Sequence, residues 1–251
     1  YIVFCGVHFM AETADILSRS KQTVILPDMA AGCSMADMAA IEQVDHCWET
    51  LGRILPVEET VMPAVYVNSA AVLKAFCGEH GGITCTSSNA KAVIDWSWAR
   101  REKILFFPDE HLGRNTANKM GLAKEEMIVW DPFQPNGGNT RGAIQRAKLI
   151  LWKGHCSVHQ MFQPVHVDNF RKQYPEGKVI VHPECHEDVV NKADLSGSTE
   201  FIIKTVTAAP AGTAWAVGTE LNLVNRLKRN LTDKKVFFLS STVCQSATMF
   251  R

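Results

Sequence analysis

The feature that most constrains the fold of this chain is a series of short apolar runs in which polar and apolar residues do not alternate. Runs of this kind, rich in Val, Ile and Phe, are typical of strands that are buried on both faces of a sheet. Amphipathic segments separate the runs, and strands that alternate with helices predict an α/β protein with mostly parallel sheets. The expected strands are 1–4, 23–26, 64–67, 104–107, 148–152, 178–181, 214–217 and 236–239. The expected helices are 9–17, 70–76, 90–99, 115–120, 187–192, 200–206 and 220–229.

A repeated order of strand, helix, strand and cysteine divides the sequence into similar parts. The first copy ends at Cys33, the second at Cys156 and the third at Cys244. The second and third copies are each preceded by a further half-repeat, which is missing before the first copy. We therefore expect three αβα units with parallel sheets, related by a pseudo-threefold axis, of which the first is incomplete. The expected units are 1–62, 63–160 and 161–251.

The first residue, Tyr1, already lies inside an expected strand, and such a strand needs a neighbour. We therefore expect the sequence to be part of a longer protein.

Composition narrows the classes of function. The 26 Lys and Arg residues balance the 26 Asp and Glu residues, so no charge pattern typical of nucleic-acid or anionic-membrane binding is present. Apolar residues make up 46% and charged residues 21%, which is typical of globular domains. No apolar stretch is long enough to span a membrane, and no signal peptide is visible at the start. We expect a cytoplasmic protein.

The eight cysteines contain no C-x-x-C pair, which argues against a zinc ribbon or a thioredoxin-like motif. In parallel sheets, ligands gather outside the carboxyl ends of the strands, so three related units would bring Cys33, Cys156 and Cys244 toward one point. Three thiolates suit an iron–sulfur cluster in which one iron keeps an open position and acts as a Lewis acid. Three cysteines and a water molecule also suit zinc, and spacing alone does not separate the two metals.

Several longer motifs together span the whole sequence, and they are the segments 4–14, 26–28, 31–34, 66–68, 86–90, 108–109, 111–114, 152–159, 182–184, 197–199 and 218–220. In these segments the chain resembles the quinolinate synthase family. The resemblance implies three pseudo-symmetric αβα domains and a 4Fe-4S cluster with three cysteine ligands. It also implies the condensation of iminosuccinate with dihydroxyacetone phosphate to quinolinate, with loss of phosphate and water, in de novo NAD biosynthesis. An L-aspartate oxidase or aspartate dehydrogenase is then the expected functional partner.

The resemblance places Cys33 and Cys156 in the first two cluster motifs. The third motif departs from the family pattern, because the usual ligand position is occupied by Ser246 and the nearest cysteine is Cys244. Serine is a poor iron ligand, since the pKa of its hydroxyl lies far above that of a thiol. We take Cys244 as the third expected ligand, and an absent or weak cluster remains the alternative. His155 and His159, which flank Cys156, are candidates for support of the cluster.

The resemblance also implies the substrate site. Tyr66, His182 and Glu184 are the expected catalytic residues, with proton transfer by the last two. The expected substrate-binding residues are Tyr66, Asn68, Ser87, His182, Glu184, Ser198 and Thr199. Hydroxyl groups and backbone N–H groups at helix starts suit carboxylate and phosphate oxygens.

Two rival functions remain open at this point. One is an iron–sulfur or zinc-binding α/β protein without catalysis, and the other is a metal-free lyase or aldolase that uses a lysine. Because the family has a further N-terminal half-domain that supplies substrate residues, we expect the chain as given not to turn over.

Overall fold

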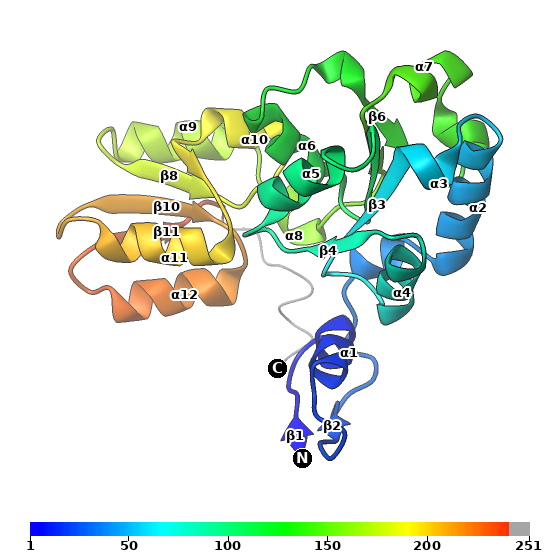
Figure 1. Ribbon diagram of the computed structural model, residues 1–251. Coiled ribbons are helices and arrows are strands. Elements are labelled where there is room, and N and C mark those ends of the chain that lie inside the picture. The colour runs from blue at the N-terminus through cyan, green and yellow to red at the C-terminus, as the bar shows by residue number, and fades with distance from the viewer. Residues whose placement is uncertain (241–251) are drawn as a thin grey trace. The chain divides into compact units, whose positions relative to one another are not determined.

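The structure is a computed structural model, and it describes residues 1–240. The described residues form an α/β fold with three separate sheets, all of whose neighbouring strands run parallel, as the sequence predicts (Figure 1). The chain divides into two compact units, which are Tyr1–Gly154 and the residues from His155 on. No helix among the residues described here has the length and apolar character needed to cross a membrane.

The elements are short and alternate along the chain. The strands are β1 (Ile2–Val3), β2 (Val24–Ile25), β3 (Val61–Tyr66), β4 (Ile83–Cys85), β5 (Lys103–Phe107), β6 (Met127–Trp130), β7 (Leu149–Trp152), β8 (Lys178–Val181), β9 (Leu195–Ser196), β10 (Ala214–Gly218) and β11 (Lys235–Phe238). The α-helices are α1 (His8–Ile16), α2 (Ile41–Gly52), α3 (Val57–Thr60), α4 (Ala71–Glu79), α5 (Ala90–Trp98), α6 (Glu110–Lys119), α7 (Arg141–Arg146), α8 (Ser157–Gln160), α9 (Pro164–Gln173), α10 (Glu187–Lys192), α11 (Thr199–Ala208) and α12 (Leu221–Asn230). Short 3₁₀ helices are η1 (Ala36–Met38), η2 (Lys124–Glu126) and η3 (Pro135–Gly138).

The first unit contains two sheets. The smaller sheet pairs β1 with β2, and helix α1 lies against it (Figure 1). The side chain of Glu12 in α1 accepts a hydrogen bond from the backbone N–H of Ala71, the first residue of α4, at 2.8 Å. This contact ties the small sheet to the rest of the first unit.

The larger sheet of the first unit has the strand order β4-β3-β5-β7-β6. Every residue of β3, β5 and β7 is buried, which explains why these strands read as continuous apolar runs. Alternate residues face opposite sides of a strand. Helices α2, α4 and α7 pack with Leu105 and Phe107 on one side. Helix α6 lies on the other side, where Gly113 fits closely against Phe106 and Leu151.

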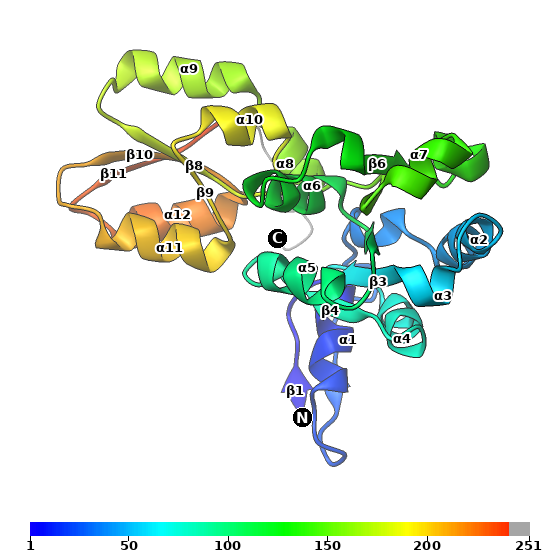
Figure 2. The same cartoon turned by 45° about the horizontal axis from the view of Figure 1, so that its top comes forward.

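The second unit contains one sheet, with the order β11-β10-β8-β9, covered on both faces (Figure 2). Helices α9 and α10 share one apolar cluster with Val179, Val181 and Ala216. Helices α11 and α12 share another with Ile180 and Val217. Each strand therefore sends alternate side chains into two separate cores.

The strand pairs match the predicted repeat. In each predicted copy the two strands pair directly, as β1 with β2, β5 with β7 and β10 with β11. The half-repeats form the neighbouring pairs β3 with β4 and β8 with β9. The order β4-β3-β5-β7 of one sheet thus recurs as β9-β8-β10-β11 in the other. The boundaries at 62/63 and 160/161 and the pseudo-threefold axis stay predictions.

The structure adds elements that the sequence reading left out. These are the outer strands β4, β6 and β9 and the helices α2, α3, α7, α8 and α9. Strands β4 and β9 have only 3 and 2 residues and carry little apolar pattern, whereas β6 is a run of apolar residues that the sequence reading overlooked.

Candidate functional site

Three of the expected substrate residues lie at the carboxyl ends of neighbouring strands in the first unit. Tyr66 is the buried last residue of β3, and it pairs in register with Cys85, the last residue of β4. Asn68 and Ser87, both half-buried, each follow this pair by two positions. A backbone hydrogen bond from Val67 to the carbonyl of Cys85, at 2.8 Å, holds the two strand ends together. Parallel pairing therefore brings these three residues to one edge of the sheet.

Of the expected metal ligands, Cys33 and Cys156 are described. Cys33 is half-buried in the connection that follows β2, where its carbonyl accepts a hydrogen bond from Asp37 at 3.2 Å. Cys156 is half-buried and precedes the first residue of α8. Cys244 and Ser246 lie outside the described residues. Cys5 is exposed, whereas Cys47, Cys77, Cys85 and Cys185 are buried.

The second unit repeats the arrangement of strand ends. Val181 of β8 pairs with Ser196 of β9. His182 follows β8 directly, and Ser198 lies two positions after the end of β9. Ser198 is the buried N-cap of α11, where its hydroxyl accepts a hydrogen bond from the N–H of Phe201 at 3.3 Å. Thr199 is exposed at the first position of α11. Both residues lie at the positively polarised end of a helix.

His182 and Glu184 are almost completely buried after β8, with exposed fractions of 3% and 2%. The backbone N–H of His182 donates to the carbonyl of Gly218 in β10 at 3.0 Å, which fixes the turn against the neighbouring strand. The N–H of Glu184 donates to Nδ1 of His182 at 3.3 Å. An Nδ1 atom that accepts a hydrogen bond carries no proton, so this contact selects a neutral imidazole with its proton on Nε2.

Burial lowers the pKa of His182 to about 4, and the nearby His159 adds to this lowering, while the Glu184 carboxylate opposes it. A group whose pKa lies this far below neutrality is uncharged at pH 7. Its Nε2–H is therefore that of a neutral hydrogen-bond donor, and not a fixed positive charge.

A second histidine completes this cluster. His159 of α8 stacks on His182, with ring centroids 4.7 Å apart and an angle of 25° between the planes. Its Nδ1 atom lies 2.9 Å from Oε2 of Glu184. Its Nε2 atom lies 3.2 Å from the hydroxyl of Thr219, which follows β10. The donor atoms of Cys156, His159 and Glu184 all lie within 4.8 Å of one another.

Sequence reasoning placed His159 only as support for a cluster, and it assigned no role to Thr219. The spacing of Cys156 and His159 was a usable signal, because residues three positions apart lie on one face of a helical turn. The contact with Glu184 had no local signal, since it joins segments from separate strand connections. That the seven expected substrate-binding residues form one site stays a prediction.

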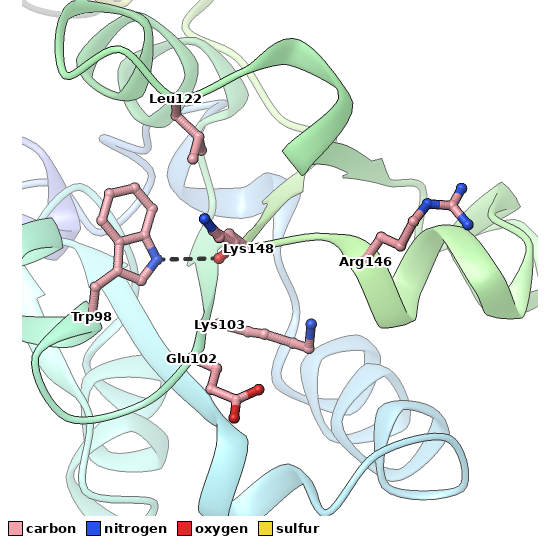
Figure 3. A pocket seen from close by; sticks show the side chains of 6 residues that line it. All are labelled: Trp98, Glu102, Lys103, Leu122, Arg146 and Lys148. Atoms are coloured by element: carbon pink, nitrogen blue, oxygen red, sulfur yellow. Dashed lines mark hydrogen bonds between the residues drawn. The ribbon is translucent and has the colours of Figure 1, made fainter.

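A pocket of about 500 Å³ opens in the first unit, at the amino ends of the strands (Figure 3). It is lined by Trp98, Glu102, Lys103, Leu122, Arg146 and Lys148. Lys103 begins β5 and Lys148 precedes β7, so the pocket lies at the opposite edge of the sheet from Tyr66. It contains none of the expected substrate residues.

Comparison with known proteins identifies relatives along the whole chain. The family model described as "NadA: Quinolinate synthetase A protein" matches residues 1–251. The chain is 57% identical to the quinolinate synthase of Rhodopirellula baltica over 261 residues, covering 100% of the chain and 66% of that protein. It is 58% identical to the quinolinate synthase of Acidobacterium capsulatum over 254 residues, covering 68% of that protein. Against the quinolinate synthase of a Nocardioides species it is 55% identical over 258 residues, covering 65% of that protein. The chain thus spans about two thirds of the length of these curated relatives.

Proposed function

The chain belongs to the quinolinate synthetase A family, and on this premise we propose that the protein is a quinolinate synthase of de novo NAD biosynthesis. Its substrates are iminosuccinate and dihydroxyacetone phosphate, and the reaction releases phosphate and water. An enzyme that oxidises aspartate, such as an L-aspartate oxidase or an aspartate dehydrogenase, supplies the imine. The observation that carries this proposal is the buried group of His182, Glu184 and His159 at the strand ends of the second unit.

Glu184 is the proton-transfer group in this proposal. Its carboxylate is buried beside two imidazole rings, with Oε1 3.8 Å from Nδ1 of His182 and Oε2 2.9 Å from His159. A carboxylate held in this way can take a proton from carbon during enolisation and return it during loss of water. Neutral His182 donates its Nε2–H to a substrate oxygen, and Tyr66 provides a further hydroxyl for the same reacting groups.

The remaining residues bind the anionic parts of the substrates. Ser87 precedes α5 by a short turn, and Ser198 and Thr199 begin α11. Hydroxyls and backbone N–H groups at a helix start attract carboxylate and phosphate oxygens. Asn68 adds an amide donor. The set offers donors without a second carboxylate, which suits a dicarboxylate substrate.

We propose that Cys33, Cys156 and Cys244 hold a 4Fe-4S cluster. The two described thiols fit this role, because each is half-buried in the chain that follows a strand and neither is sealed in an apolar core. When bound, the cluster supplies a Lewis-acidic iron with an open coordination position. His182 and Glu184 position the substrate and move the protons.

The test is the substitution Glu184→Gln in the protein that contains this chain. We expect quinolinate formation to fall by about 10²- to 10⁴-fold, the usual contribution of general acid–base catalysis, while the iron content stays the same. Glu200→Gln is the matched control, because Glu200 is an exposed carboxylate on α11 that pairs with Lys204, at 2.6 Å. Activity of Glu184→Gln within about threefold of the unchanged protein would remove Glu184 from the mechanism.

A further inference from the structure

The side chains of Cys156, His159 and Glu184 form a compact group of three different metal-binding atoms. Their donor atoms lie within 4.8 Å of one another, and all three residues belong to the second unit. Cys156 caps α8 and His159 lies in its single turn, so both point from one face of the helix. Glu184 comes from the turn after β8. Two strand connections therefore supply the three atoms.

His159 places a ring nitrogen close to a carboxylate in this arrangement. Its side chain is 8% exposed, and its Nδ1 atom makes no hydrogen bond among the described residues. That atom nevertheless lies 2.9 Å from Oε2 of Glu184. In the tautomer whose Nε2–H donates to the hydroxyl of Thr219, at 3.2 Å, Nδ1 offers a lone pair beside the carboxylate oxygen. A cation that lies between the two atoms can bind both.

From this geometry we propose that Cys156, His159 and Glu184 bind a single Zn²⁺ ion. One thiolate, one imidazole and one carboxylate are the ligand types that zinc takes, and three protein ligands leave a fourth position for water or an anion. Mg²⁺ and Ca²⁺ favour oxygen ligands only, so the thiolate and imidazole select against them. Cys156 is half-buried, which gives the ion a path from the surface.

Neighbouring groups support the ligands in the way that metal sites require. A metal-bound imidazole usually donates its other N–H to a fixed acceptor, and buried Thr219 occupies that place for His159. The amide of Gln160 donates to the backbone carbonyl of Glu184 at 3.2 Å, which holds the turn that carries the carboxylate. Both contacts lie within the second unit.

This site does not depend on the proposed function. Zinc and the proposed cluster both need Cys156, so one chain holds either metal group but not both. Zinc would also occupy the Glu184 carboxylate. A chain that has bound zinc at this site therefore does not assemble the cluster.

The experiment uses the full chain, freed of metal with a chelator and titrated with Zn²⁺ or Co²⁺ without oxygen. We expect one bound zinc per chain by mass spectrometry of the metal. We expect Co²⁺ to give a thiolate-to-cobalt absorption band, which Cys156→Ser removes. Cys185→Ser is the matched control, because Cys185 is a buried thiol of the same unit outside the group.

Two further variants separate zinc binding from folding. His159→Gln keeps an amide that can reach Thr219 but lacks the Nδ1 donor, and we expect at least about tenfold weaker zinc binding with an unchanged circular dichroism spectrum. Thr219→Val removes only the supporting hydroxyl, and we expect about 10- to 100-fold weaker binding, the usual cost of losing such a partner. Zinc affinity that is equal in the unchanged chain, His159→Gln and Cys156→Ser would overturn the proposal.

The outcome is independent of the test of the proposed function. Cys33→Ser should leave zinc affinity unchanged, because Cys33 lies outside the zinc group, while it should lower the iron content after reconstitution. Zinc binding without iron–sulfur assembly would support this inference and count against the cluster. Cluster assembly with no zinc binding at Cys156 would support the cluster and contradict this inference.

Discussion

Lys103 is a buried cation at the first position of β5, and its surroundings show how single residues hold this fold. The side chain is 6% exposed, and Nζ donates to the carbonyls of Gln145 and Ala147 at 2.6 and 2.8 Å. These carbonyls lie at the end of α7, where the helix leaves its last carbonyl groups without partners inside the helix. Lys103 therefore joins the end of α7 to the sheet.

We expect Lys103→Met to lower the free energy of unfolding by about 1–3 kcal/mol, because it leaves buried carbonyls without donors. Lys148→Met is the control, since Lys148 lines the same pocket but its side chain is 55% exposed and pairs with Glu126 at the surface. Lys148→Met should lower the free energy of unfolding by a clearly smaller amount. Urea unfolding of the three proteins measures the difference, and equal stability of both variants would show that the Lys103 contacts contribute nothing.

The cysteines provide a second test at the residue scale. Burial raises the pKa of the thiols of Cys47, Cys77 and Cys85, in the last case to about 12. At pH 8 these groups are neutral thiols, which are poor nucleophiles, and they are shielded as well. We expect iodoacetamide to modify exposed Cys5 fully while the three buried thiols stay unmodified, and to modify all of them in denaturant. Mass spectrometry of peptides measures this, and equal rates in the native protein would contradict the described core.

The helices of the second unit depend on side chains at their starts. Glu220 caps α12, and its carboxylate accepts hydrogen bonds from the N–H groups of Asn222 and Leu223 at 2.8 and 3.0 Å. We expect Glu220→Ala to cost about 1 kcal/mol of stability, the typical value for loss of such a cap. Glu200→Ala serves as the comparison, because this exposed carboxylate pairs with Lys204 at the surface. A thermal unfolding experiment in which both variants melt together would argue against the cap.

At the same scale, the sequence predicted the buried strands because burial on both faces leaves a continuous apolar run, as in β5 and β7. It also predicted the repeated order of strand, helix and strand, and the two strands of each copy pair directly in the structure. Helix α2 was missed although Val44, Cys47, Trp48 and Leu51 recur at helical spacing and form part of the core. Strand β9 was missed because a strand of 2 residues has no periodicity to detect. Contacts such as that of His159 with Glu184 were out of reach, because they depend on how separate strand connections pack.

For the molecule as a whole, the repeat gives one rule for where the proposed functional residues lie. Tyr66 and Ser87 follow or end one strand pair, and His182 and Ser198 follow the matching pair of the other large sheet. Cys33 comes after β2 and Cys156 after β7, which are the second strands of their copies. The second strand of a copy is therefore followed by a thiol. The strands of the half-repeats are followed by hydroxyl, imidazole or amide groups.

This rule makes a prediction for iron binding. After anaerobic reconstitution with iron and sulfide, we expect Cys33→Ser, Cys156→Ser and Cys244→Ser each to lose most bound iron, because a serine hydroxyl keeps its proton where a thiol gives it up. Cys5→Ser should keep its iron, since Cys5 follows the first strand of a copy and not the second. Iron analysis and visible absorption measure the result.

In the third copy of the repeat, the iron ligand is either Cys244 or Ser246, and one substitution distinguishes them. Cys244 and Ser246 both lie beyond the described residues, two positions apart in the sequence. If Cys244 is the ligand, Ser246→Cys should leave the iron content unchanged, because the set of three thiolates is already complete. A rise in iron on this substitution would instead place the ligand at position 246. If Cys33→Ser retained as much iron as the unchanged chain, the three-cysteine cluster would be excluded. Between β2 and the larger sheet, the sequence contains one other cysteine, Cys47, and this residue is buried in the core.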